Sequence, residues 1–291
     1  MKALSNLLIA YDGSGCSDAA LGDLSRAGLP ASLNALVLTA TDVILPPPDK
    51  ELPDEPAVRI PEVERYAREK AEKVLGEARA RAERAAERVR ADFPGWRVEV
   101  ATEADVAGWA VIKMADRMPA DLVVVGSHRH AVAGGRLILG STSQRVLYDA
   151  RCSVRAARCS DVRREGPVRL VVGFNGTHEA EEAVEAVASR VWPEGSEARL
   201  VIAGDVSGPE APGVAAERLR AAGLSVSESV RAGGPAHVLV HEAEEWGADS
   251  IFVGTRGLHG FQHLLHGSVA SAVAARAQCS VEVVRPATAA A

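Results

Sequence analysis

The sequence predicts an α/β protein that consists of two tandem domains, each a doubly wound fold with a five-stranded parallel sheet. The first observation is that apolar strand patterns alternate with helical patterns, which is typical of a parallel sheet covered on both faces. The second is that the same motifs occur twice along the chain in the same order. The third is that turn residues and glycine-rich segments follow strands, and doubly wound folds bind ligands at the carboxyl ends of their strands.

Three matches indicate a tandem duplication. The segment LLIAYDGS at 7–14 returns 163 positions later as LVVGFNGT, and DLVVVGS at 121–127 returns 128 positions later as DSIFVGT. Cys152-Ser153-Val154 returns 127 positions later as Cys279-Ser280-Val281. The polar segment 161–167 contains Gly-Pro and separates the two copies. We therefore expect one domain at residues 1–160 and a second at residues 167–291.

The elements of the first half follow from their local patterns. An apolar strand precedes Asp12-Gly13-Ser14-Gly15, which is a turn sequence with a helix N-cap residue. Six prolines between Pro46 and Pro61 exclude regular structure and predict a surface loop. Ala, Glu, Arg and Lys with apolar residues at helical spacing then predict one long amphipathic helix at 62–92. The remaining elements are strands at 7–10, 35–40, 97–102, 122–126 and 153–157, and helices at 17–27, at 106–118 and from residue 141.

The second half repeats this order with one difference. A short helix at 214–222 replaces the long helix, which makes this copy 35 residues shorter (163 minus 128). Pro235 stands in the first turn of a helix, where its missing N–H has no intrahelical partner to lose. The elements are strands at 169–174, 198–203, 226–230, 251–254 and 281–285, and helices at 179–190, 214–222, 235–246 and from residue 268.

The composition excludes several classes of protein. Hydrophobic residues make up 47% and charged residues 25% of the 291 residues, as in ordinary globular proteins. The net charge of −6 argues against a general binder of nucleic acid or of anionic membranes. No apolar run has the length of a membrane span, the first ten residues run directly into a strand pattern, and four cysteines do not form a disulfide framework. We therefore expect a cytoplasmic protein.

The segment around Gly254 has the layout of an anion site, with a strand, a glycine-bearing loop and a helix start. Gly254, Gly257 and Gly260 allow the backbone to approach a ligand closely. Gly267 and Ser268 would direct backbone N–H groups, a hydroxyl and a helix dipole at a phosphate. No lysine follows the last glycine, so the loop is not a Walker-type P-loop. Its first glycine pair also lacks the Gly-x-Gly spacing of the dinucleotide fingerprint.

The complete spacing is Gly-x-x-Gly, nine residues, then Gly-Ser, and it resembles the nucleotide-binding signature of the ATP-binding universal stress proteins. The strand before the loop and the closing segment CSVEVVR at 279–285 resemble the same family, and the resemblance covers nearly all of both halves. It implies a Rossmann-like fold of the adenine nucleotide alpha hydrolase type. It also implies an internal pseudo-dimer whose last strands, 153–157 and 281–285, pair with each other, and binding of ATP with magnesium as a possible companion.

The resemblance further implies which residues contact the nucleotide. In the family an Asp at the end of the first strand lies beside the adenine, and the glycine loop contacts the ribose and phosphates. The second half would supply Asn175, Ala203, Gly254, Thr255, Arg256, Gly257, Gly260, Gly267, Ser268 and Val269. The first half would supply Asp12, Ala40, Gly126, Gly140, Ser141 and Thr142.

Each half keeps only part of the family pattern. The first half keeps Asp12, but Arg129 stands at the position of the second loop glycine and adds a side chain where backbone would touch the phosphates. The second half keeps the whole loop but carries Asn175, which forms hydrogen bonds and lacks the charge that helps to hold magnesium. We therefore expect the second half to bind ATP and the first half to be a degenerate copy.

The histidines and cysteines have ordinary interpretations. His259, His263 and His266 lack a Cys or carboxylate at ligand spacing, so we expect surface histidines rather than a metal site. His128 and His130 either contact phosphates or are solvated, and both interpretations stay open.

Nucleophilic catalysis is not indicated. Cys152 and Cys279 stand at equivalent strand starts and are expected to be core residues. No base partner is visible for a cysteine, and no second group is visible that would orient water beside Asp12.

The expected function is that of an ATP-binding stress-response sensor or regulator with slow or no hydrolysis. Two alternatives stay open. One is a scaffold that binds no nucleotide and acts through protein contacts, with helix 62–92 as its surface; the other is a weak ATPase. A homodimer is possible, and the sequence does not identify a regulatory protein partner.

Overall fold

The computed structural model describes residues 4–43, 61–127, 130–132, 136–158, 166–204, 211–255 and 268–286. The first half contains β1 (Asn6–Ala10), α1 (Gly15–Asp23), the 3-10 helix η1 (Leu24–Arg26), β2 (Asn34–Thr41), α2 (Pro61–Asp92), β3 (Arg97–Ala104), α3 (Ala107–Arg117), β4 (Leu122–Ser127), β5 (His130–Val132), β6 (Arg136–Ile138), α4 (Ser141–Asp149) and β7 (Ser153–Arg158). The second half contains β8 (Arg169–Gly173), α5 (His178–Ala188), β9 (Glu197–Ala203), α6 (Pro212–Ala221), β10 (Ser225–Arg231), α7 (Pro235–Trp246), β11 (Ser250–Gly254), α8 (Ser268–Arg276) and β12 (Ser280–Val284).

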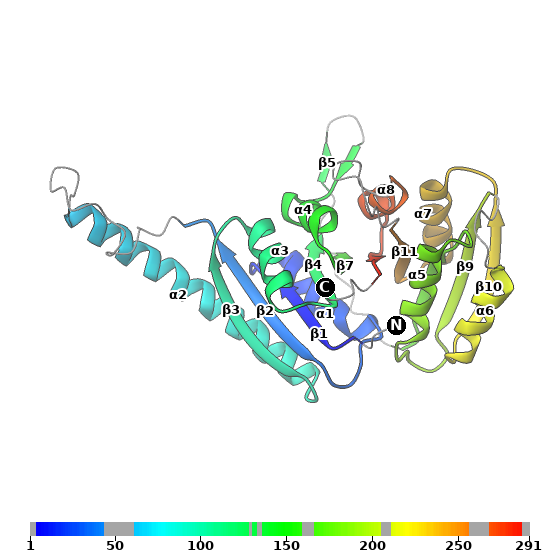
Figure 1. Cartoon of the computed structure of the whole chain (residues 1–291), viewed down its shortest axis with the longest axis horizontal. Coiled ribbons are helices and arrows are strands. Elements are labelled where there is room, and N and C mark those ends of the chain that lie inside the picture. Colours follow the sequence, from blue (N-terminus) through cyan, green and yellow to red (C-terminus); the bar gives the residue numbers. More distant parts are fainter. Residues whose placement is uncertain are drawn as a thin grey trace.

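One ten-stranded sheet runs through both halves in the order β10-β9-β8-β11-β12-β7-β4-β1-β2-β3. Within each half all neighbouring strands of this sheet are parallel, and the chain moves outward in both directions from the first strand (Figure 1). This is the doubly wound order, so the predicted fold class is confirmed.

The two halves join through their last strands. β12 pairs with β7 in antiparallel register, as Val281 with Ala156, Glu282 with Arg155 and Val283 with Val154. The expected pairing of these strands is therefore confirmed, and the chain is an internal pseudo-dimer.

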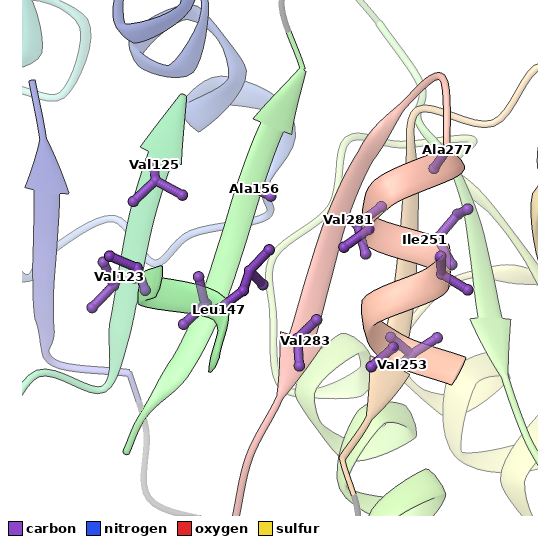
Figure 2. Close-up of a cluster of buried hydrophobic side chains, with 14 of the residues drawn as sticks. Val123, Val125, Leu147, Ala156, Ile251, Val253, Ala277, Val281 and Val283 are labelled. Atoms are coloured by element: carbon purple, nitrogen blue, oxygen red, sulfur yellow. The ribbon is translucent and has the colours of Figure 1, made fainter. Parts of the chain in front are cut away.

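The apolar core is continuous across this seam on one face of the sheet. A single cluster of buried side chains extends from Leu38 in β2 to Val201 in β9. Its middle part includes Val123 in β4 and Ile251 in β11 and is covered by α4 and α8 (Figure 2). On the other face the buried side chains form two separate clusters, one under α1 and α2 and one under α5 and α6. The continuous apolar core therefore joins the halves on one face. On the other face they meet through separate contacts, such as Trp192 against Gly28 and the backbone N–H of Val191, which donates to the carbonyl oxygen of Gly28 at 3.1 Å.

The long helix α2 agrees with its predicted range, and its C-terminal part packs on β2 and β3. Its buried face consists mainly of alanines, namely Ala78, Ala82, Ala85 and Ala86, followed by Val89. Small side chains permit a close approach of the helix to the sheet. The N-terminal part runs out past the edge of the sheet (Figure 1), and Tyr66 there is 67% exposed.

Strand β10 departs from the prediction that the strands are apolar throughout, because it forms an edge of the sheet and most of its residues are exposed. Beside it, Glu242 in α7 is a buried carboxylate that accepts hydrogen bonds from Arg231 Nε at 2.7 Å and Arg199 Nη1 at 3.3 Å. Burial would raise the pKa of Glu242, but hydrogen bonds from Arg231, Ser229 and Arg199 bring it below its usual value. The arginines therefore hold this carboxyl in its ionised form.

We expect Glu242→Gln to lower the free energy of unfolding at pH 7 by about 1–2 kcal/mol, because charge-assisted hydrogen bonds stabilise by about that amount and the arginines are partly in solvent. A carboxyl whose folded-state pKa is depressed stabilises the fold above its unfolded pKa, which is close to 4.5, and loses this contribution as the pH falls through the folded value. Urea unfolding at several pH values should therefore show the difference between the two proteins shrinking in acid. Glu245→Gln, at a carboxylate with a 52% exposed side chain, is the control with little expected effect. A difference that stays constant down to acid pH would contradict the assignment.

In the described segments of the chain, no helix is both long enough and apolar enough to cross a bilayer.

Candidate functional site

The chain reverses its direction of winding between β1 and β4 in the first half and between β8 and β11 in the second. The carboxyl ends of these neighbouring strands form the switch point at which open α/β sheets bind ligands. The Asp12 turn follows β1 and the Asn175 turn follows β8, so the topology places both predicted turns at a switch point.

The two turns have the same hydrogen-bonded form. Asp12 Oδ1 accepts from the backbone N–H of Ser14 at 2.9 Å. Asn175 Oδ1 accepts from the backbone N–H of Thr177 at 3.2 Å and from its hydroxyl at 2.8 Å. Each is a side chain that accepts from the backbone two residues on, as in an Asx-turn, and a glycine with positive φ lies between the partners. Replacing Asp by Asn therefore keeps the turn and removes only the negative charge.

The carboxylate of Asp12 is held in its ionised state. Burial would raise its pKa, but hydrogen bonds from Ser14 and Ser17 lower the pKa below the usual value. Ser14 also caps α1, because its Oγ accepts from the backbone N–H of Ser17 at 3.3 Å. A carboxylate committed to a turn in this way is a weak general base.

The glycines at the ends of β4 and β11 have a packing role in addition to the predicted ligand role. A Cβ at Gly126 would overlap the carbonyl oxygen of Cys16 in α1, and a Cβ at Gly254 would overlap that of Glu179 in α5. The first helix of each half thus passes directly over the end of the fourth parallel strand. Glycine is required there to admit the helix, a reason that no local pattern in the sequence indicates.

The residues after β11 begin the predicted phosphate loop. Thr255 is hydrogen-bonded to the last strand, because its backbone N–H donates to the carbonyl oxygen of Val284 at 3.1 Å. Arg256, Gly257, Gly260 and Gly267 lie outside the described residues, as do His259, His263 and His266. Ser268 opens α8 and Val269 is partly buried in its first turn. The loop therefore leaves β11 and ends at a helix N-terminus, as its sequence predicts.

Ala40 and Ala203 lie in the strands that neighbour β1 and β8, near the turns that follow those two strands. Ala40 is in β2 and Ala203 is the last residue of β9, and both are partly buried. The backbone links these strands to the turns in the same way in both halves, since Tyr11 N donates to Leu38 O at 2.9 Å and Phe174 N donates to Val201 O at 3.0 Å.

The first half differs from the second in the segment that follows β4. The region expected to be a loop contains a hairpin, in which β5 and β6 pair antiparallel with His130 opposite Ile138. Two apolar triplets on either side of Gly134-Gly135 carry a hairpin signal that the sequence analysis did not use. Strand β6 also contacts α8 of the second half. His128 and Arg129 lie outside the described residues.

Helix α4 begins after this hairpin at the predicted Gly140-Ser141-Thr142 segment. Gly140 is its N-cap and supplies no side chain to cap the helix, so the first N–H groups of α4 have no side-chain cap. Ser143 Oγ donates to the carbonyl oxygen of Gly126 at 2.7 Å, which anchors the helix start to the end of β4. The predicted first-half residues that can be described thus lie at the carboxyl ends of the strands.

The long helix places the aliphatic part of an arginine side chain at the first-half turn. The side chain of Arg81 in α2 packs against Gly13, the residue after Asp12. The amphipathic pattern of residues 62–92 gives no sign of this contact. The second half has only the short helix α6 at the corresponding place in chain order.

The cysteines agree with their expected core role. Cys152 and Cys279 pack against the continuous core cluster. Burial raises the pKa of Cys152 to about 11 and that of Cys279 to about 12, which leaves both thiols protonated and unreactive. Among the residues that can be described, no group of three or more His, Cys, Asp or Glu side chains forms a metal site.

Comparison with known proteins gives consistent matches along the chain. The model of the universal stress protein family matches residues 4–158 and again residues 168–285. A universal stress protein of Mycolicibacterium smegmatis is 34% identical over 194 residues, which cover 57% of this chain and 62% of that protein. A universal stress protein A homologue of Coxiella burnetii is 43% identical over 53 residues, 18% of this chain and 34% of that protein. The matched region thus spans less than two thirds of the length of each relative.

Two solved structures extend over nearly the whole chain. A universal stress protein from Archaeoglobus fulgidus has a TM-score of 0.60 at 21% identity and covers 96% of both chains. A functionally unknown protein from Pseudomonas aeruginosa has a TM-score of 0.52 at 16% identity, over 98% of this chain and 94% of that one. At these identities the likeness concerns the fold.

Proposed function

The chain belongs to the universal stress protein family, and from this premise we propose that its second half binds an adenine nucleotide, with ATP as the ligand. The observation that carries the proposal is where the glycine segment begins and ends. The spacing from Gly254 through Gly257 to Gly267-Ser268 is the nucleotide signature that the sequence resembles. The segment begins at the end of β11, which pairs with β8 at the switch point, and it leads to α8, while the Asn175 turn follows β8.

The proposed contacts follow from the donors that this edge offers. Asn175 uses its Oδ1 to hold the turn, which leaves the amide Nδ2 to donate to an acceptor nitrogen of the adenine ring. Ala203 would flank the base through its small side chain. Backbone N–H groups of the loop, the hydroxyl of Ser268 and the N-terminus of α8 would bind the phosphates. Magnesium would be held mainly by the phosphates, because Asn175 brings no charge.

A regulatory role fits this site better than catalysis of hydrolysis. The carboxylate at the first-half turn is already committed to Ser14 and Ser17, and the second half has a neutral amide at the same position. Neither group is suited to activate water. We therefore infer a cytoplasmic stress-response sensor or regulator that senses the nucleotide and hydrolyses it slowly or not at all.

The first half is proposed to be a degenerate nucleotide site. Arg129 replaces the second loop glycine, and a hairpin follows β4 where the second half has the glycine loop. Arg81 beside Gly13 adds a further difference between the two turns.

The first test is to denature freshly purified protein and to analyse the supernatant for adenine nucleotide by chromatography and mass spectrometry. We expect ATP at about one equivalent per chain, which corresponds to one working site. Two equivalents would show that the first half binds nucleotide as well.

An empty protein that also fails to bind added Mg-ATP in calorimetry would overturn the proposal and favour the scaffold alternative, with α2 as its contact surface. Steady release of phosphate from Mg-ATP would instead favour the ATPase alternative.

A further inference from the structure

The seam between β7 and β12 has a local two-fold axis that passes through one residue pair. Equivalent positions in these two strands lie 127 positions apart. Arg155 faces Glu282 in the antiparallel register, and these two residues are themselves 127 positions apart. In the pairs on either side, each residue faces a position two residues from its own equivalent: Val154 faces Val283 instead of Val281, and Ala156 faces Val281 instead of Val283. A residue that meets its own equivalent across an isologous interface lies on the two-fold axis.

Hydrogen bonds on both sides of the axis obey the same symmetry. Arg158 N donates to Ser280 Oγ at 3.1 Å, and Arg285 N donates to Ser153 Oγ at 3.1 Å. The guanidinium groups of these two arginines cross the seam in opposite directions, each to a carbonyl oxygen in the last turn of the other half's final helix. These contacts are therefore symmetric across the axis, whereas the two side chains on the axis itself carry opposite charges.

Four charged side chains of alternating sign lie across the axis. Arg155 and Glu282 are fully buried, and Arg155 Nη1 lies 3.4 Å from Glu282 Oε2. Arg155 Nε donates to Asp23 Oδ2 at 2.5 Å, and Arg190 Nη1 donates to Glu282 Oε2 at 2.9 Å. The resulting order is Asp23, Arg155, Glu282, Arg190, with two negative and two positive charges. Buried charges are stabilised only when they are paired in this way.

Each half contributes its own ion pair to this row. Asp23 and Arg155 belong to the first half, and Glu282 and Arg190 belong to the second. If two first halves met on this axis, the order would be negative, positive, positive, negative, and two buried guanidinium groups would face each other. Two second halves would bring two buried carboxylates together. Only unlike halves give alternating charges.

The row occupies the face of the seam where apolar packing is interrupted. Val154 belongs to the continuous core, together with Ala156, Val281 and Val283 (Figure 2). Successive side chains of a strand point to opposite faces, so Arg155 between Val154 and Ala156 points to the opposite face. On that face the two apolar clusters are separate. The small apolar side chains on the core face discriminate weakly between the halves, whereas the opposite charges on the axis discriminate by their sign.

We propose that Arg155 and Glu282, each supported by the counter-ion of its own half, select the pairing of unlike halves and exclude pairing of two first halves or two second halves from different chains. The partner of each half at the seam is thus specified as the unlike half of this protein. The proposal concerns the seam between the halves and is independent of nucleotide binding.

The test changes the order of the four charges along the row and keeps the number of positive and negative charges the same. The first-half swap combines Asp23→Arg with Arg155→Glu, and the second-half swap combines Arg190→Glu with Glu282→Arg. Each swap keeps the ion pair within its half but puts like charges on the axis. The fourfold variant carries both swaps and restores alternation. We expect each swap to lower the melting temperature by several degrees and the fourfold variant to recover most of that loss, although it carries the most substitutions.

A mixing experiment tests the selection of partners directly. When the two swapped proteins are refolded together, the altered halves carry opposite charges on the axis, so we expect a two-chain complex in light scattering that neither protein forms alone. Recovery in the fourfold variant or in the mixture supports the proposal, also where a single swap does not fold. A fourfold variant at least as unstable as the sum of the two swaps, together with no two-chain complex, would overturn it.

Discussion

Gly254→Ala is expected to lower the free energy of unfolding by about 3 kcal/mol, at the upper end of the range for overpacked sites. A Cβ at this position would overlap the backbone carbonyl of Glu179, and a backbone atom in a packed helix cannot rotate away as a side chain does. Helix α5 would have to move off the end of β11. Gly126→Ala should have an effect of the same kind, because its Cβ would overlap the backbone at Cys16.

The matched control is Gly76→Ala in α2, where nothing lies within 4 Å of the added Cβ. Alanine in an exposed helix interior stabilises by about 0.5–1 kcal/mol relative to glycine, so the same substitution should have the opposite sign there. Urea unfolding of nucleotide-free protein measures the change in the free energy of unfolding for both substitutions. If Gly254→Ala were as stable as the wild type, the packing role of this glycine would be wrong, and a role in ligand approach would be its remaining reason.

Gly257→Arg is expected to weaken the binding of Mg-ATP to the second half by tenfold or more. The substitution copies into the second half the residue that the first half carries as Arg129. An arginine side chain would occupy space that the resemblance assigns to the phosphates, and each lost charge-assisted hydrogen bond costs about 1–3 kcal/mol. Because every 1.4 kcal/mol is a factor of ten, the loss of one such contact is measurable by isothermal titration calorimetry.

Gly76→Arg adds the same charge at an exposed position of α2 and should leave the affinity unchanged. Unchanged affinity in Gly257→Arg itself would show that the glycine loop is not the phosphate site. A melting temperature close to that of the wild type must accompany the lost affinity, so that weaker binding is not an effect of unfolding.

The Asp12 and Asn175 turns have the same form although the two side chains differ in charge. Both side chains accept hydrogen bonds from the residue two positions later, and this role requires only an oxygen acceptor. The change from Asp to Asn therefore keeps the turn and alters the charge offered to a ligand.

Most of the fold was accessible from the sequence because its signals are local or repeated. Strand and helix patterns, the proline-rich boundary before α2 and the matches between copies each depend on neighbouring residues or on simple offsets. The glycine-loop signature was accessible for the same reason. The hairpin β5–β6 was missed because strands of three residues are too short for their periodicity to stand out.

Other features depend on contacts between residues far apart in the chain and were decided by the tertiary structure. The need for glycine at Gly126 and Gly254 arises from the approach of a helix that begins about 110 or 75 positions earlier. The position of Arg155 opposite Glu282 depends on the antiparallel register of two strands 127 positions apart. Periodicity shows which residues are apolar and what each segment becomes. Which charges meet, and which backbone atoms leave no room for a side chain, is determined only when the elements are packed together, because those energies depend on distances that no local pattern contains.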